Sequence, residues 1–98
     1  MAINEKLIEL EGQRGIFQIL IFLHQNGEMI SGRLYNNKPE INISNNITAN
    51  RALEILLKHD LICKKEMDNN RAIYYCLTVR GSKICKCIRD MEKILDDI

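Results

Sequence analysis

The sequence has little that would favour a membrane, fibrous or extended protein. None of its apolar runs approaches the roughly 20 residues that a membrane-spanning helix needs, and it contains no repeat, low-complexity tract or flexible linker. Its first residues show no basic segment followed by a long apolar block, as a signal peptide would. The 98 residues therefore predict one globular domain in the cytoplasm.

Motifs that mark enzymes and bound cofactors are also lacking. The sequence contains no Gly-rich phosphate loop, no HExxH zinc motif and no nucleophile elbow. Of its two histidines, His24 falls on an apolar helix and His59 at a helix end, where it can bond the last carbonyl groups. We therefore expect no catalytic residue, no cofactor and no metal site.

The four cysteines do not have the spacing of a disulfide scaffold or of a metal site. Cys63 and Cys76 fall in predicted strands, and Cys85 and Cys87 fall in a predicted helix, about 200° apart around its axis. No pair has the CxxC form, and a cytosol keeps thiols reduced. We expect free thiols that pack as small hydrophobic side chains, with a metal-binding or redox-sensing role as the alternative.

What the chain does contain is an uneven distribution of charge. The net charge is only +1. Residues 31–89, however, carry eleven Lys or Arg and five Asp or Glu, whereas residues 1–30 carry two and four, and residues 90–98 carry one and four. Positive charge therefore gathers on one segment, as binding to phosphate would require, and solvated surface charge is the alternative.

The basic segment also has an informative order of elements. Residues 44–59 predict an amphipathic helix, with Leu53, Leu56 and Leu57 on one face and the polar residues mostly off it. Two β-rich runs follow, over 61–66 and 72–77, joined by a polar turn. A helix followed by a β-ribbon is typical of a winged helix-turn-helix domain, whose helix is of a size to enter the major groove of DNA.

The residues before this segment predict the rest of a small helical core. Residues 15–24 are apolar on one helical face and on others too, so this helix should be nearly enclosed, and it should end before Gly27. A weaker pattern predicts a helical turn over 3–12, and residues 28–30 suit an edge strand. A short helix over 32–37 should end before Pro39.

Thr78 is predicted to cap a last helix of about 20 residues that runs to about Asp97. Apolar residues recur along it at steps of four, three, four and three, which is the spacing of a coiled-coil seam. A helix this long extends past a small domain, so we expect it to pair with a second copy of the chain. The alternative is that the stripe folds back on residues 15–24. The predicted dimer interface consists of Ile84, Ile88, Met91, Leu95 and Ile98.

Short motifs in this order resemble those of MarR-type winged-helix regulators. The run Thr48–Leu56, followed by Leu61-Ile62, is similar to their recognition helix and first wing strand, and residues 77–81 are similar to the Leu-Thr-x-x-Gly after the wing. Residues 41–44 and 75–78 look more like the HxlR branch. The resemblance covers about residues 15–88 and implies a dimeric transcription regulator. Asp60 in place of Gly, the long connector before residue 44 and the absence of Trp depart from the family pattern.

The predicted fold is mainly α with a small β-ribbon (α+β). It is a winged helix-turn-helix domain, with a core over about residues 13–79 and a long C-terminal dimerisation helix over about 78–97. We expect this domain to bind double-stranded DNA sequence-specifically as a homodimer, and no residue requires a small-molecule effector. The alternative is a winged-helix module for protein–protein interaction that does not bind DNA, since a fold does not dictate its function.

The expected DNA contacts lie on the helix, on the wing and before both. Asn can bond an adenine edge and Arg a guanine edge, and a helix N-terminus offers free N–H groups to phosphate; capping is the alternative role for the first of the polar residues. The helix residues are Ser44, Asn45, Asn46, Thr48, Asn50 and Arg51. The wing residues, expected on the backbone or in the minor groove, are Lys64, Lys65, Asn69, Asn70 and Arg71. Arg33 and Lys38 are further candidate phosphate contacts.

Overall fold

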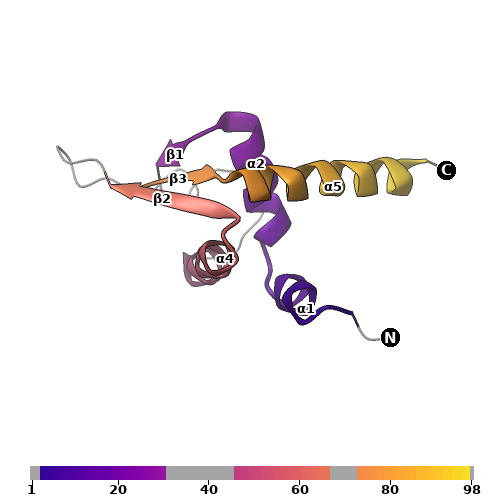
Figure 1. The fold of residues 1–98 in the computed structure, drawn as a ribbon, viewed down its shortest axis with the longest axis horizontal. Coiled ribbons are helices and arrows are strands. Elements are labelled where there is room, and N and C mark those ends of the chain that lie inside the picture. Colours follow the sequence, from indigo (N-terminus) through magenta and orange to yellow (C-terminus); the bar gives the residue numbers. More distant parts are fainter. Residues whose placement is uncertain (1–2, 31–45, 67–72, 98) are drawn as a thin grey trace.

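The computed structural model describes residues 3–30, 46–66 and 73–97 (Figure 1). The helices are α1 (Glu5–Gly12), α2 (Ile16–Asn26), α4 (Asn46–Lys58) and α5 (Val79–Asp96), and the strands are β1 (Met29–Ile30), β2 (Ile62–Glu66) and β3 (Ile73–Leu77). The fold is mainly helical with a small antiparallel sheet, an α+β arrangement, as the sequence predicts. The predicted helix over 32–37 lies outside the described residues.

The helix α2 forms the centre of the core. Ile19 and Leu20 on its apolar face have no exposed surface. Gly15 before the helix (φ 95°) and Gly27 after it (φ 74°) adopt backbone conformations with positive φ, which cost glycine least. The prediction that this helix is nearly enclosed is wrong for Phe17, whose side chain is 44% exposed, because it faces a groove between α1 and α5.

The helix α4 packs one apolar face onto this core and ends in a Schellman motif. The Leu61 N–H donates to the Leu56 carbonyl oxygen (2.9 Å), and the Asp60 N–H donates to that of Leu57 (3.1 Å). Asp60 takes the left-handed position (φ 59°) that glycine usually holds at such an end. The helix predicted over 44–59 is confirmed over the described residues, and its end at Lys58 lies within one residue of the predicted end. Its buried side chains are Ala49, Ala52, Leu53 and Leu56.

The three described strands pair in the order β1–β3–β2, and every pairing is antiparallel. The β2–β3 ladder pairs Ile62 with Leu77 at one end and Glu66 with Ile73 at the other. Successive side chains of a strand point to opposite faces, so Ile62 and Tyr75, both buried, lie on the face that meets the core. The edge strand predicted over 28–30 is confirmed as β1.

Cys63 and Cys76 lie opposite each other in the β2–β3 ladder and form a disulfide, with their Cα atoms 5.4 Å apart. The expectation of free thiols is therefore wrong for this pair, because the register of the strands brings together two cysteines that are 13 residues apart in sequence. Cys85 and Cys87 are free, Cys85 being buried and Cys87 exposed. Burial raises the pKa of the Cys85 thiol, which donates a hydrogen bond to the Leu20 carbonyl oxygen (3.4 Å).

Two turns of the chain meet at a junction formed by Asp60, Leu61, Thr78 and Gly81, which we call the Thr78 junction. The Thr78 hydroxyl accepts from the Gly81 N–H (3.0 Å), so Thr78 is the N-cap of α5, as predicted. The same hydroxyl donates to the Asp60 carbonyl oxygen (2.7 Å), and the Thr78 N–H donates to that of Leu61 (3.2 Å). These bonds fix the end of α4 against the start of α5.

The helix α5 divides into a half that packs on its own chain and an exposed half. Ile88 is buried in the core against α2, and Ile84 packs at the edge of that core. For Ile84 and Ile88 the alternative prediction, that the apolar stripe of this helix folds back on α2, therefore applies. Ile88 leaves little exposed surface for a dimer interface. Met91 and Leu95 in the second half are 44% and 76% exposed. Ile98 lies outside the described residues.

We expect Gly81→Ala to destabilise the fold by about 3 kcal/mol, because a Cβ at residue 81 would collide with the Leu61 carbonyl oxygen. Backbone cannot yield as the end of a flexible side chain can, so α5 would have to move. Urea denaturation followed by circular dichroism measures the free energy of unfolding. Gly12→Ala is the matched control, since a Cβ there meets nothing within 4 Å and alanine favours a helix. Equal stability of the two variants would contradict the close approach.

Candidate nucleic-acid interface

The N-terminal half of α4 presents polar side chains to solvent. Asn50 and Arg51 are exposed, and Thr48 is half-buried. The Thr48 carbonyl oxygen accepts a hydrogen bond from Gln13 Nε2 (3.4 Å), which ties this end of α4 to the turn between α1 and α2. Ile47 is 65% exposed and adds an apolar side chain near these polar groups. The helix therefore offers hydrogen-bonding groups and an apolar side chain on a surface that its own core leaves open.

The β-ribbon carries the second set of predicted contacts. Lys64 and Lys65 are both exposed on β2. Because side chains alternate, Lys64 lies on the same face of the ribbon as Tyr75, and Lys65 lies on the opposite face. Lys65 forms an ion pair with Glu28, with Nζ 3.2 Å from Oε2. Lys64 and Lys65 thus place a cation on each face of the ribbon.

The helix and the ribbon are adjacent in space. In Figure 1, α4 lies beside β2, and the β2–β3 ribbon extends away from the core at the end opposite to the C-terminus of α5. The structure thus places α4, which carries Asn50 and Arg51, in contact with β2, which carries Lys64 and Lys65.

The remaining predicted contacts lie outside the described residues. They are the side chain of Asn46 and the residues Ser44, Asn45, Asn69, Asn70, Arg71, Arg33 and Lys38.

An ionic cluster joins α1 to the end of α4. The Glu9 carboxylate accepts from Lys58 Nζ (3.0 Å) and lies 2.5 Å from His59 Nε2. The hydrogen bond from Lys58 and the neighbouring His59 hold the pKa of the Glu9 carboxyl below its usual value. Sequence reasoning missed this cluster, because its members are about 50 positions apart in sequence. The only available signal was the acidic character of residues 1–30 beside a basic central segment.

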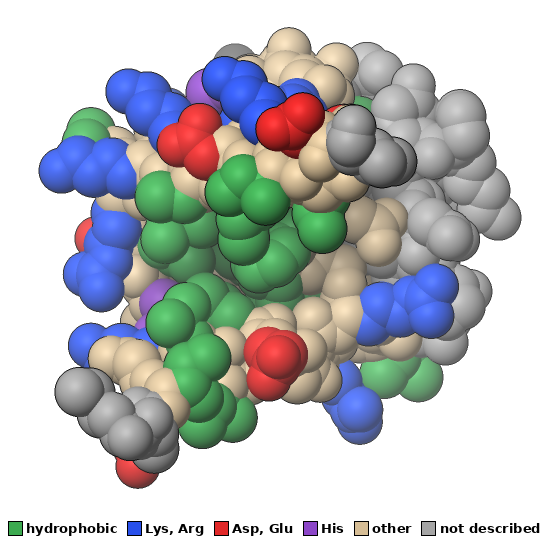
Figure 2. Space-filling view, turned by 90° about the vertical axis from the view of Figure 1, so that its right-hand side faces the viewer, with side chains coloured by type: hydrophobic (Ala, Val, Ile, Leu, Met, Phe, Trp, Pro, Cys, Tyr) green, Lys and Arg blue, Asp and Glu red, His purple; other side chains and the backbone are tan. Residues whose placement is uncertain are grey.

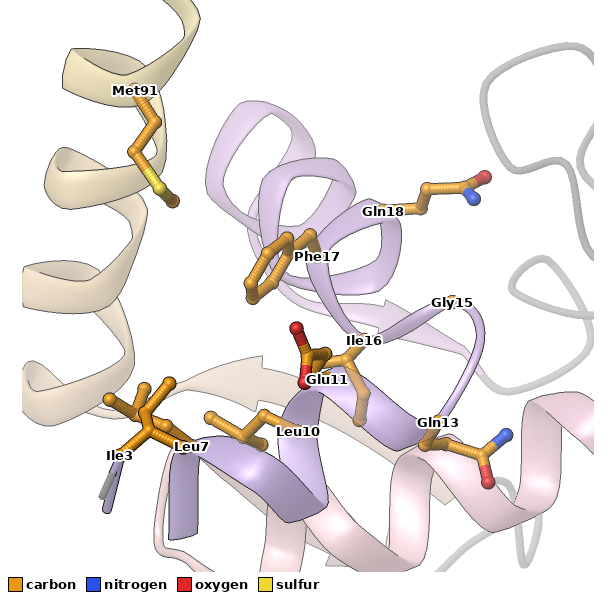
Figure 3. Close-up of a pocket in the computed structure, with 10 residues that line it drawn as sticks. All are labelled: Ile3, Leu7, Leu10, Glu11, Gln13, Gly15, Ile16, Phe17, Gln18 and Met91. Carbon is orange, nitrogen blue, oxygen red and sulfur yellow. The ribbon is translucent and has the colours of Figure 1, made fainter. Parts of the chain in front are cut away.

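An apolar groove of about 460 Å³ lies between α1, α2 and α5, at the end of the molecule away from the ribbon. Figure 2 shows hydrophobic side chains gathered in a hollow on this face, with charged side chains around it. In the close-up, Ile3, Leu7, Phe17 and Met91 border the open space, and the Glu11 carboxylate also points into it (Figure 3). Of these residues, only Met91 belongs to the predicted dimer interface.

The described residues hold no candidate metal site, since no three His, Cys, Asp or Glu side chains gather among them as such a site would require. Along those same parts of the chain, no helix combines the length and the apolar character that a bilayer span needs.

No protein-family model, curated protein or solved structure matches the chain. Function must therefore be inferred from the chain's own residues.

We expect Glu9→Gln to make the stability of the fold less sensitive to acid. A carboxyl whose pKa is lowered by folding stabilises the folded state above its ordinary value of 4.5, and this contribution is lost as the pH falls through the lowered pKa. The wild type should therefore lose more stability than the variant when the pH falls from about 6 to about 3. Urea denaturation at several pH values measures the difference.

The matched control for this pH series is Asp90→Asn, which removes one carboxylate from an exposed position of α5. If Glu9→Gln and Asp90→Asn gave parallel curves, the ionic cluster would not contribute to the attachment of α1.

Proposed function

We propose that the chain is a cytoplasmic, winged helix-turn-helix transcription regulator that binds double-stranded DNA sequence-specifically as a homodimer. The observation that carries this proposal is the adjacency of two exposed elements. The helix α4 presents Asn50 and Arg51 to solvent, and the ribbon beside it presents Lys64 and Lys65. A helix that reads bases beside a cationic ribbon that holds the backbone is the arrangement through which a winged helix engages a duplex.

The helix has the dimensions and the anchoring for base recognition. Its 13 residues give a length of about 20 Å, and an α-helix fits the major groove. Its buried alanines and leucines set which face is turned outward, so Asn50 and Arg51 do not have to leave the core to reach a base. Arg suits the O6 and N7 atoms of guanine, and Asn suits the N6 and N7 atoms of adenine. Ile47 can meet a thymine methyl group.

The ribbon supplies affinity that does not depend on sequence. Lys64 and Lys65 can neutralise phosphates, which releases condensed counterions and makes binding salt-dependent. Lys65 is held by Glu28 in the free protein, so that its transfer to a phosphate exchanges one anion for another. Lys64 lies on the face of the ribbon that meets the core, and α4 is in contact with β2.

The opposite end of the molecule supplies the surface for a second copy. Met91, Ile94 and Leu95 on α5 are exposed, and the apolar groove beside α1 and α2 continues this surface. Two copies that join at this end leave both α4 helices and both ribbons uncovered. A two-fold dimer of this kind reads a palindromic site, with half-sites a whole number of helical turns apart.

We expect Arg51→Ala to weaken binding to a duplex selected from a random pool by about tenfold, with a much smaller effect on random duplex, because the lost guanine contact carries sequence information. Lys64→Ala should weaken binding to both duplexes and lower the salt dependence by about one phosphate contact. Fluorescence anisotropy with labelled duplex over a salt series measures both effects.

Lys6→Ala is the control for these variants, because it removes an exposed positive charge on α1, far from the ribbon in sequence and in Figure 1. It should bind both duplexes like the wild type. If neither the wild type nor any of the variants bound random duplex at low salt, this result would contradict DNA binding and favour a protein–protein interaction module. Wild-type binding by Arg51→Ala would show that α4 does not read bases.

We expect Leu95→Glu to convert the dimer to a monomer without unfolding the chain. Leu95 is 76% exposed, so its own chain does not need it, whereas a carboxylate would be buried without a partner at the interface. Size-exclusion chromatography with light scattering measures the mass. Lys86→Glu, which also adds negative charge to an exposed position of α5, should remain dimeric. A monomeric wild type at the concentrations used for DNA binding would contradict the dimer.

A further inference from the structure

The Cys63–Cys76 disulfide crosses the ribbon on the face that does not meet the core. Cys63 alternates with the buried Ile62, so it shares the outer face of β2 with Lys65. Both bonded cysteines are half-buried, in contrast to Cys85, which has no exposed surface. A small thiol or disulfide in solution can therefore reach this pair, and the reaction would take place next to a predicted DNA contact.

The disulfide lies next to the buried base of the ribbon, at the point where the exposed part of β2 begins. Beyond Cys63, the side chains of β2 are all exposed: Lys64, Lys65 and Glu66. These residues bury little against the rest of the fold, so the ladder there depends on backbone hydrogen bonds, on the Lys65–Glu28 ion pair and on the covalent bond. A slip of the register by one residue would turn each side chain to the other face, and the disulfide forbids such a slip. The bond therefore adds to the Thr78 junction in fixing where both lysines lie relative to α4.

We propose that Cys63 and Cys76 form a reversible redox switch of the ribbon, whose disulfide form binds duplex DNA more tightly than its dithiol form. The inference rests on the proposed function, since the ribbon is the wing of that DNA-binding domain. With the disulfide present, Lys64 and Lys65 are ordered before DNA arrives. In the dithiol form the DNA must order the ribbon itself, and affinity falls by about tenfold, the scale of ordering one long side chain.

The oxidant is a low-molecular-weight disulfide, and the reaction is thiol–disulfide exchange. One protein thiolate attacks a sulfur of the small disulfide, which forms a mixed disulfide and releases one small thiol. The second protein thiolate then attacks the protein sulfur of the mixed disulfide and releases the second small thiol. Two protein thiols have lost two electrons, the small disulfide has gained them, and the two thiol protons end on the two released thiols. Excess small thiol reverses both steps.

The test uses the full chain with Cys87→Ser, so that no exposed thiol competes. The protein is equilibrated with mixtures of reduced and oxidised glutathione. Alkylation and mass spectrometry count the free thiols, and anisotropy measures binding to a random duplex of about 20 base pairs at low salt. We expect affinity to rise about tenfold over the same glutathione ratios at which two thiols disappear. A variant that also carries Cys63→Ser and Cys76→Ser should bind like the dithiol form at every ratio.

Hydrogen exchange of the amides in residues 62–66 and 73–77 provides a readout that does not involve DNA. Exchange should be slower in the disulfide form, and equal exchange in the two forms would overturn the switch. Failure of the pair to oxidise at any glutathione ratio would also overturn it. If both forms bind DNA equally, the inference fails and the proposed function stands. If neither form binds DNA although the thiols titrate together, the proposed function fails, and control of affinity fails with it.

Discussion

The Thr78 junction is the constraint on which the rest of the molecule depends. One hydroxyl accepts from the first turn of α5 and donates to the backbone at the end of α4, so a single side chain ties these two helices together. The close approach of Gly81 to Leu61 completes the contact. Since β2 begins directly after Leu61 and β3 ends directly before Thr78, the base of the ribbon is fixed by the same atoms.

This arrangement separates the polar and cationic surface of the molecule from its apolar surface. The polar face of α4 and the lysines of the ribbon lie at one end, and the apolar groove with the far half of α5 lies at the other (Figure 1). Binding of a polyanion and binding of a second apolar surface therefore do not compete for the same residues. The ionic cluster of Glu9, Lys58 and His59 bridges the two regions, because it attaches α1, which borders the groove, to the end of α4.

Local signals made much of this fold predictable. Periodic leucines and the Thr78 cap placed α4, the ribbon and α5 to within about two residues, because helix faces and caps are properties of neighbouring residues. The exposure of Phe17 depends on which elements meet, and the prediction that its helix is nearly enclosed is wrong there. The burial of Ile88 depends on the same packing, and for this residue the sequence left open both a dimer interface and a fold back on α2. The pairing of Cys63 with Cys76 depends on strand register, which no spacing rule revealed. The winged-helix assignment and the base contacts stay predictions, because the pattern of exposed side chains is compatible with them without testing them.

The position of β2 has a further consequence for the behaviour of many copies together. Within the described sheet, β2 is an outer strand, and an outer strand offers unpaired backbone groups to any other chain. Lys64 and Lys65 follow each other along it, one on each face, and bringing two such strands together would oppose like charges. The same cations that suit a phosphate backbone thus protect the molecule from edge-to-edge aggregation at high concentration.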